Sequence, residues 1–193
     1  MKIDNMISSL LAFSLLILFS PVLLLAFLLI VLEDGFPVFF KQQRVGKNKK
    51  LFGIYKFRTM KRDTPNVAKH LLQDPQKFHL KSGSFIRDFS IDELPNLINI
   101  LKGEMNFIGP RPALYNEYEF IEMREKAGVN KLKPGLTGWA QVNGRDYLAN
   151  EEKCQFDKEY LDKKSMAFDL KILLMSFGAV AAPILLRLKR KSK

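Results

Sequence analysis

Two adjacent carboxylates, Asp92 and Glu93, lie where a short amphipathic helix is predicted to begin. Apolar residues follow them at i, i+3, i+4 and i+7, which is one face of an α-helix, and they are Leu94, Leu97, Ile98 and Leu101. Arg87 precedes the pair, and the turn at residues 109–112 presents Arg111 between Pro110 and Pro112. An anionic pair flanked by guanidinium groups predicts phosphate chemistry with a metal ion.

A second interpretation fits the same residues. Ser90 and Glu93 have the spacing of a capping box, in which the glutamate bonds back to the backbone of the serine. Pro95 fits the first helical turn better if Asp92 is the N-cap, because an N–H is unpaired there in any case. Either register puts the pair at a helix N-terminus, so the residues themselves leave a cap and a catalytic role both open.

The charge of the chain indicates anionic partners. The 193 residues carry 31 Lys and Arg against 20 Asp and Glu, a net charge of +11. Nucleic acid, phosphorylated small molecules and an anionic membrane surface are the candidate partner classes. Cys154 is the single cysteine, which excludes an internal disulfide, and its surroundings in the sequence favour a half-buried helical residue over a nucleophile.

A hydrophobic segment near the N-terminus predicts contact with a membrane. Residues 10–32 are 23 residues without a charge, enough to span a bilayer. Ser20-Pro21 lies near the middle: the proline cannot donate to the carbonyl of Ile17, and the serine hydroxyl can bond back to the carbonyl of Leu16. The residues therefore allow a kinked spanning helix or a re-entrant hairpin that leaves on the side it entered.

The remaining segments predict the elements that position the pair. Residues 37–40 and 51–55 read as strands joined by a basic turn at residues 46–48, and residues 104–108 read as a short strand. Helices are predicted at residues 114–126 and 149–164, and residues 61–82 are compatible with a helix. Residues 168–188 predict an interfacial helix with a basic end. The chain divides into a membrane segment, residues 1–35, and a cytoplasmic-face domain, residues 36–193, where Lys and Arg dominate after the hydrophobic segment.

Five motifs occur in an order that resembles the monotopic phosphoglycosyl transferases of the bacterial sugar transferase family. They are Leu18-Phe19-Ser20-Pro21, residues 55–60 (YKFRTM), Asp92-Glu93-Leu94-Pro95, Gly109-Pro110-Arg111-Pro112 and residues 134–145 (PGLTGWAQVNGR). The resemblance runs from about Ser8 to the C-terminal region and is closest to the small form of these enzymes. It implies transfer of a sugar-1-phosphate from a UDP-sugar to a polyprenol (undecaprenyl) phosphate, with release of UMP, early in glycoconjugate assembly.

The resemblance also implies a fold and a location. The expected fold class is α+β and mostly helical, with a re-entrant membrane helix that breaks at Ser20-Pro21. A small catalytic domain with a short β-hairpin and interfacial amphipathic helices lies on the cytoplasmic face of the bacterial inner membrane. Four residues depart from the family pattern. Asp4-Asn5 and Ser8 stand where a Lys-Arg pair and an Asp are common, which puts the anchoring of the first turn in doubt, and Asn96 replaces a usual Gln.

Site residues follow from the resemblance, motif by motif. Asp92 is expected to attack the β-phosphorus and form a phosphosugar-aspartyl enzyme, and Asp92 and Glu93 are the expected ligands of Mg²⁺. Pro110 and Pro112 are expected to hold Arg111 rigidly. The expected phosphate and nucleotide contacts are Lys56, Arg87, Arg111 and Arg145.

Two rival functions are compatible with the composition. A membrane-tethered protein that binds anionic ligands would use the charge of +11, and an inactive relative would serve as a scaffold. The Lys and Arg residues concentrate near the membrane segment and the tail, which favours an anionic lipid bilayer over nucleic acid as partner. No residue pattern identifies the transferred sugar or an oligomeric state.

Overall fold

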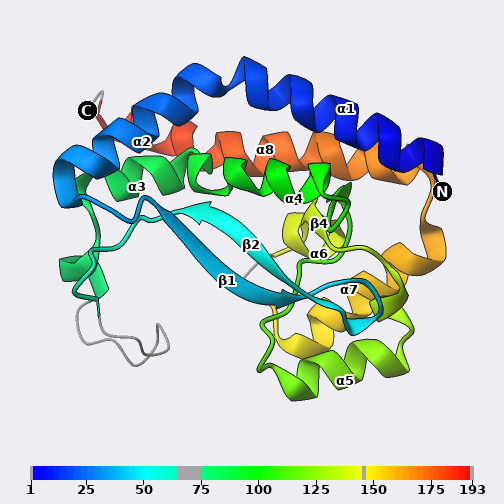
Figure 1. Ribbon diagram of the computed structural model, residues 1–193. Coiled ribbons are helices and arrows are strands. Elements are labelled where there is room, and N and C mark those ends of the chain that lie inside the picture. Colours follow the sequence, from blue (N-terminus) through cyan, green and yellow to red (C-terminus); the bar gives the residue numbers. More distant parts are fainter. Residues whose placement is uncertain (1, 65–74, 145–146, 192–193) are drawn as a thin grey trace.

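The computed structural model describes residues 2–64, 75–144 and 147–191 and has a mostly helical α+β fold (Figure 1). The helices are α1 (Lys2–Leu18), α2 (Ser20–Asp34), α3 (Lys81–Asp88), α4 (Leu97–Leu101), α5 (Tyr118–Lys126), α6 (Trp139–Val142), α7 (Asn150–Lys163) and α8 (Met166–Lys191). The strands are β1 (Phe39–Val45), β2 (Leu51–Phe57), β3 (Asn106–Ile108) and β4 (Gly135–Thr137). Short 3₁₀ helices are η1 (Lys47–Lys49), η3 (Pro75–Phe78), η4 (Ile91–Asn96) and η5 (Val129–Lys131).

Helices α1 and α2 are separated by a sharp bend at Phe19. The described parts, Asn5–Leu18 and Ser20–Asp34, meet at 60°. The Ser20 hydroxyl donates to the carbonyl of Ile17 at 2.7 Å, and not to Leu16 as the sequence predicted. Pro21 has no N–H to offer that carbonyl, so the serine satisfies the acceptor that the proline leaves open. The predicted break is confirmed, and its hydrogen bond is shifted by one residue.

The bent pair is apolar on its outer surface. None of the described helices is by itself both long and apolar enough to cross a bilayer, whereas α1 and α2 taken together meet that criterion. Large apolar side chains are exposed along α1, α2 and the described part of α8, among them Leu10, Phe13, Leu24, Leu32, Leu174 and Phe177. In Figure 1, α8 (orange to red) is drawn at the same edge of the view as α1 and α2 (blue), and α2 and α8 line the same cavity.

Beneath these helices, β1 and β2 form the predicted antiparallel hairpin, in register from Phe39↔Phe57 to Val45↔Leu51. Side chains alternate across a strand, so Phe52, Ile54 and Lys56 share one face. Phe52 and Ile54 enter a core that also contains Ala12 of α1 and Leu97 of α4. Lys56 therefore points toward η4 and α4 because its two neighbours on that face are buried.

Fully buried Asn99 joins the hairpin to α4. Its Nδ2 donates to the carbonyl of Gly53 at 2.8 Å and to Glu104 Oε2 at 2.7 Å, while its Oδ1 accepts from the backbone N–H of Tyr55 at 3.3 Å. A buried amide with these partners fixes the register between two elements. The predicted apolar face of this segment is confirmed in part, since Leu97 is buried and Leu94 and Leu101 pack at the edge of the same core.

A second, parallel pair of strands carries the arginine turn. β3 pairs with β4 at Asn106↔Gly135 and Ile108↔Thr137, which confirms the predicted strand in residues 104–108. The helix predicted from Leu114 begins four residues later, at Tyr118. The backbone before it is engaged elsewhere, because the carbonyl of Ala113 accepts from Val45 at 2.9 Å and the N–H of Leu114 donates to Glu117. Helix α7 matches its prediction closely, and residues 65–74 of the helix-compatible segment lie outside the described residues.

The N-terminal end of α1 makes a polar contact with the rest of the protein through Asn5. Lys133 Nζ donates to Asn5 Oδ1 at 3.0 Å. This contact joins the start of α1 to the loop that precedes β4.

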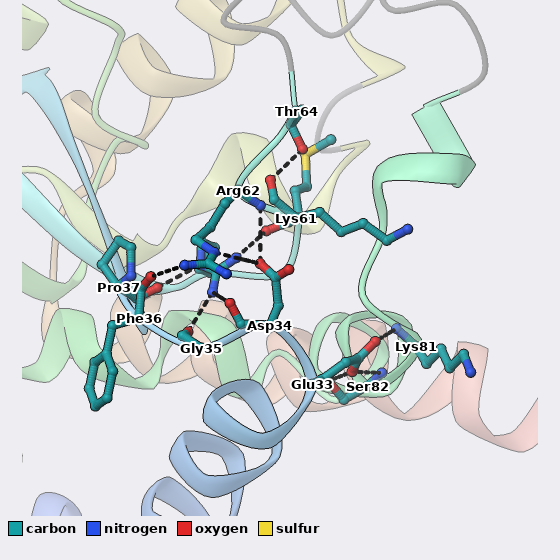
Figure 2. Close-up of polar contacts among 12 residues, drawn as sticks. Glu33, Asp34, Gly35, Phe36, Pro37, Lys61, Arg62, Thr64, Lys81 and Ser82 are labelled. Carbon is teal, nitrogen blue, oxygen red and sulfur yellow. Dashed lines mark hydrogen bonds and ion pairs between the residues drawn. The ribbon is translucent and has the colours of Figure 1, made fainter.

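The other end of the bent pair is held by two carboxylates, Glu33 and Asp34 (Figure 2). Glu33 accepts hydrogen bonds from the backbone N–H groups of Lys81 and Ser82 and from the Ser82 hydroxyl, and so caps α3. Asp34 pairs with the buried guanidinium of Arg58 and accepts from the backbone of Arg62. Arg58 also donates to the carbonyls of Gly35, Pro37 and Met60. These contacts, the α2 anchor, fix α2 to α3 and to the end of β2.

We predict that Asp34→Ala lowers the melting temperature in detergent by about 5 °C, because it leaves the buried Arg58 guanidinium without its carboxylate. The matched control is Asp162→Ala on α7, whose pair with Lys158 is exposed, with side chains 56% and 45% accessible. That control should shift the melting temperature by no more than about 1 °C. Equal shifts for the two variants would show that the α2 anchor contributes no more than an ordinary surface ion pair.

Candidate functional site

The carboxylate pair lies in η4 and not in the first turn of a regular α-helix. Ser90, just before it, is left-handed, with φ at 55°, and makes no side-chain capping hydrogen bond. The capping-box prediction is therefore wrong. Pro95 lies inside this segment and, having no N–H, donates to neither the i−3 nor the i−4 carbonyl. The α-helix proper begins only at Leu97.

Two cations from distant segments converge on one oxygen of Glu93. Lys56 Nζ of β2 donates to Glu93 Oε1 at 2.7 Å, and Arg111 Nη2 lies 3.4 Å from the same atom. The side chains of Lys56 and Glu93 are 17% and 18% accessible, so the contact is largely shielded from water. The structure thus joins three of the residues singled out from the sequence.

The surroundings of Asp92 shift its protonation equilibrium. Burial raises the pKa of Asp92 to about 6, and the negative charge of Glu93 adds to the increase. The positive charges of Lys56 and Arg87 act in the opposite direction. A carboxylate poised in this way near neutral pH, beside cations, is typical of a functional position.

Arg87 reaches the site from the last turn of α3, and its Nη1 lies 3.1 Å from His79 Nε2. Since α3 is capped by Glu33, the α2 anchor also determines where Arg87 lies. Arg145, the fourth predicted cation, lies outside the described residues.

The arginine turn is fixed by its backbone. Pro110 and Pro112 are buried on either side of Arg111. Arg124 Nη1 donates to the carbonyl of Arg111 at 2.8 Å, and Arg44 Nη1 donates to the carbonyl of Pro112 at 3.0 Å. Two guanidinium groups from other elements thus hold consecutive peptides of the turn.

Close backbone contacts hold the same turn from the other side. Gly109 donates to the carbonyl of Thr137 at 2.9 Å, and Gly135 donates to the carbonyl of Pro110 at 2.9 Å. A Cβ on Gly135 would lie 2.1 Å from the nitrogen of Gly109, and one on Gly138 would lie 2.0 Å from its oxygen. Only glycine allows the two chains to approach so closely.

An apolar cavity of about 700 Å³ opens beside the pair. Its walls come from α2, α3, η4, β3, β4, α6 and α8 and include Phe19 at the helix bend. Its polar lining includes Glu93 and Arg111 together with Ser90, Thr137, Gln141 and Ser176. This volume is in the range of small-molecule sites, which are mostly apolar with a few placed polar groups.

The described residues contain no cluster of three or more His, Cys, Asp or Glu side chains that could hold a metal ion. Asp92 and Glu93 offer two carboxylates. Mg²⁺ characteristically takes one or two carboxylates and completes its shell with phosphate oxygens and water. The donor set therefore fits an ion that is completed by a phosphorylated substrate.

Some residues of the site were missed from the sequence. Arg124 forms a buried ion pair with Asp157 of α7 and holds the arginine turn, yet α5 reads as a solvated acidic face. Gln141 lies within the motif at residues 134–145 and lines the cavity, but nothing in its spacing distinguishes it. Both roles depend on contacts between segments that are distant in the sequence.

Comparison with known proteins adds evidence at the level of family. A family model for bacterial sugar transferases matches residues 2–183. The uncharacterised sugar transferase EpsL of Bacillus subtilis (strain 168) is 43% identical over 161 residues, which are 83% of this chain and 78% of that protein.

Two longer relatives have names that state an activity. The UDP-glucose:undecaprenyl-phosphate glucose-1-phosphate transferase of Escherichia coli (strain K12) is 39% identical over 174 residues, which are 86% of this chain and 37% of that protein. The undecaprenyl-phosphate galactose phosphotransferase of Salmonella typhimurium (strain LT2) is 38% identical over 168 residues, which are 78% of this chain and 34% of that protein. The chain therefore spans little more than a third of these two relatives.

We predict that Asp92→Asn stabilises the metal-free protein at neutral pH. The pKa of Asp92 rises on folding from 3.8 to about 6, so above pH 6 the folded state holds a carboxylate that is more easily solvated in the unfolded chain. Removing the charge should raise the free energy of unfolding by at most about 3 kcal/mol at pH 7.5. The gain should shrink as the pH falls through 6 and vanish near pH 4, as measured by thermal unfolding in EDTA. A gain that is independent of pH would contradict this origin.

Proposed function

Because this chain belongs to the bacterial sugar transferase family, we propose that it moves a sugar-1-phosphate from a UDP-sugar to undecaprenyl phosphate and releases UMP. The observation that carries the proposal is the carboxylate pair: Glu93 is held by Lys56 and Arg111 and lines a cavity walled by apolar helices, and Asp92 precedes it directly in the chain. The polar UDP-sugar and the lipid acceptor must both reach the carboxylate pair.

In the first step, an oxygen of Asp92 attacks the β-phosphorus of the UDP-sugar. A new O–P bond forms to the aspartate, the bond between the β-phosphorus and the bridging oxygen breaks, and UMP leaves with that oxygen. The pKa of about 6 leaves Asp92 mostly ionised at neutral pH, while its partial burial keeps it poorly solvated. Both conditions favour a carboxylate nucleophile.

In the second step, a phosphate oxygen of undecaprenyl phosphate attacks the same phosphorus. The bond to Asp92 breaks, the carboxylate is restored, and the lipid diphosphate sugar is released. Since one nucleophile serves both steps, the two substrates need not be bound at the same time.

The cations have separate tasks in this proposal. Lys56 and Arg111 fix Glu93 and offer positive charge to phosphate oxygens, and Arg87 adds charge from α3. The buried prolines Pro110 and Pro112 keep Arg111 aimed at the site. Arginine suits this task because its planar fork matches phosphate oxygens. Arg145 is proposed as a further nucleotide contact on the basis of the motif alone.

Mg²⁺ is the proposed cofactor, and Asp92 and Glu93 would hold it. When bound, the ion neutralises charge on the diphosphate and favours departure of UMP. Glu93 orients the pair through its two ion pairs.

The proposed location is the bacterial inner membrane, with the catalytic domain on the cytoplasmic face and α1–α2 as a re-entrant hairpin. The 60° bend and the exposed apolar side chains of α1, α2 and α8 support this arrangement. The basic residues that follow α2 favour the cytoplasmic side and anionic lipid.

We predict that Asp92→Asn forms no phosphosugar adduct and releases no UMP when the purified protein is incubated with a panel of UDP-sugars, Mg²⁺ and undecaprenyl phosphate. The wild-type protein should do both with at least one donor, and EDTA should stop UMP release. The matched control is Asp162→Asn on the exposed face of α7, which should keep wild-type turnover. Near-normal turnover by Asp92→Asn would exclude this nucleophile, and a wild-type protein inactive on all donors would favour a scaffold or an anion-binding protein.

A cysteine at residue 2 tests the topology. In a Cys154→Ala background, Lys2→Cys should react with a membrane-impermeant maleimide only when the cytoplasmic side is exposed, as in inside-out vesicles. Lys50→Cys, on the exposed turn of the hairpin, reports the side of the domain. Opposite labelling of the two positions would establish a spanning helix instead.

A further inference from the structure

Gln141 is a buried side chain without a hydrogen-bond partner. It is 6% exposed, and among the described residues neither its Oε1 nor its Nε2 has a hydrogen-bonding partner. It lines the cavity beside Glu93 and Arg111. A buried amide that leaves both its donor and its acceptor unused is costly to the fold, so its presence needs an explanation.

Contacts on both sides of Gln141 hold the short helix that carries it. Helix α6 begins directly after the close contact of Gly138 with Gly109. The ring N–H of Trp139 donates to Glu159 Oε2 at 2.8 Å, and the carbonyl of Trp139 accepts from Asn143 at 2.7 Å. The carboxamide is thus carried by a short helix that is fixed at both ends.

Thr137, which also lines the cavity, extends the same polar region. Its Oγ1 lies 2.7 Å from Ser176 Oγ of α8. Ser176 donates to the carbonyl of Ile172 at 2.8 Å, so its proton is used there and Thr137 is the donor within the hydroxyl pair. Thr137 Oγ1 keeps lone pairs that can accept a hydrogen bond from a ligand. Gln141 and Thr137 therefore offer one donor group and two acceptors to whatever occupies the cavity.

This set of groups selects the ligand chemistry. An ionised phosphate offers only acceptors, and an isoprenoid chain offers no hydrogen-bonding groups, so neither would satisfy the amide. A hydroxyl group both donates and accepts, and the C–H faces of a sugar ring pack well on apolar walls. The polar edge of a uracil base has the same donor–acceptor complementarity, which makes the nucleotide the competing source.

We propose that Gln141, supported by Thr137, hydrogen-bonds a hydroxyl group of the transferred sugar in the cavity beside Asp92. The inference rests on the proposed function, because a sugar reaches this cavity only if its phosphate is at Arg111 and the carboxylate pair. The sugar is favoured over uracil because Gln141, Glu93 and Arg111 line one cavity, and the sugar is attached directly to the phosphorus that Asp92 attacks. Gln141 is thus a binding residue for the donor.

The test is Gln141→Met, which keeps the side-chain volume and removes the hydrogen-bonding groups. The substrate is the UDP-sugar that the wild-type protein turns over fastest in the panel above. We expect KM for this donor to rise about five- to tenfold, with no change in inhibition by UMP or in KM for undecaprenyl phosphate. The melting temperature without substrate should stay the same or rise, because an unpaired buried amide has been removed. Gln155→Met, at an exposed position of α7, is the matched control and should match the wild type throughout.

Donor analogues identify the hydroxyl. One singly deoxygenated UDP-sugar should be a poorer substrate of the wild-type protein, and that penalty should disappear in Gln141→Met, whereas penalties at the other positions should persist.

Other outcomes overturn the inference. Weaker inhibition by UMP in parallel with the higher donor KM would assign the amide to the nucleotide, and a change in acceptor KM alone would assign it to the lipid phosphate. A lower melting temperature would give Gln141 a structural role, and unchanged kinetics would leave it without a ligand. Wild-type protein that releases no UMP from any donor would instead refute the proposed function, so the two failures are distinct.

Discussion

The convergence of Lys56 and Arg111 on one oxygen of Glu93 is the contact on which the arrangement of the site depends. It joins β2, η4 and the arginine turn, which are far apart in the sequence. Each partner is held in turn from behind: Asn99 ties β2 to α4, and Arg44 and Arg124 hold the carbonyls of the turn. When both carboxylates of the pair are ionised they carry two negative charges, and the two cations balance them in a place that is largely shielded from water.

The same fold combines an apolar outer surface with a highly charged site. Apolar side chains cover the outer surface of α1, α2 and α8, while cations gather around the carboxylate pair below them. The α2 anchor couples the two, because Glu33 caps α3 and α3 carries Arg87. A shift of α2 would therefore move a cation at the site, so the apolar helices are part of the site's geometry and not only a support.

Much of the fold could be predicted from local sequence patterns. The hairpin, the helix break at Ser20-Pro21 and α7 follow from alternation, proline chemistry and helical periodicity, and the five motifs indicated the family. Contacts between distant segments were not predictable. Ser90 is left-handed and Glu93 turns to Lys56 because β2 lies there, and the buried pair of Arg124 with Asp157 looks like surface charge in the sequence. Predictions from local sequence patterns failed where contacts between distant segments determine the conformation, and those places are at the site itself.

The contact between Gly109, Gly135 and Gly138 has a consequence for how such a site can change in evolution. Backbone atoms of the two segments approach so closely that a side chain added at Gly135 or Gly138 would displace Gly109 and, with it, the arginine turn. New donor preferences are instead open to single exchanges of side chains around the cavity, such as Thr137 or Val142, which leave the backbone in place. With a fixed backbone at the carboxylate pair and exchangeable side chains around the cavity, related chains could differ in substrate and keep the same chemistry.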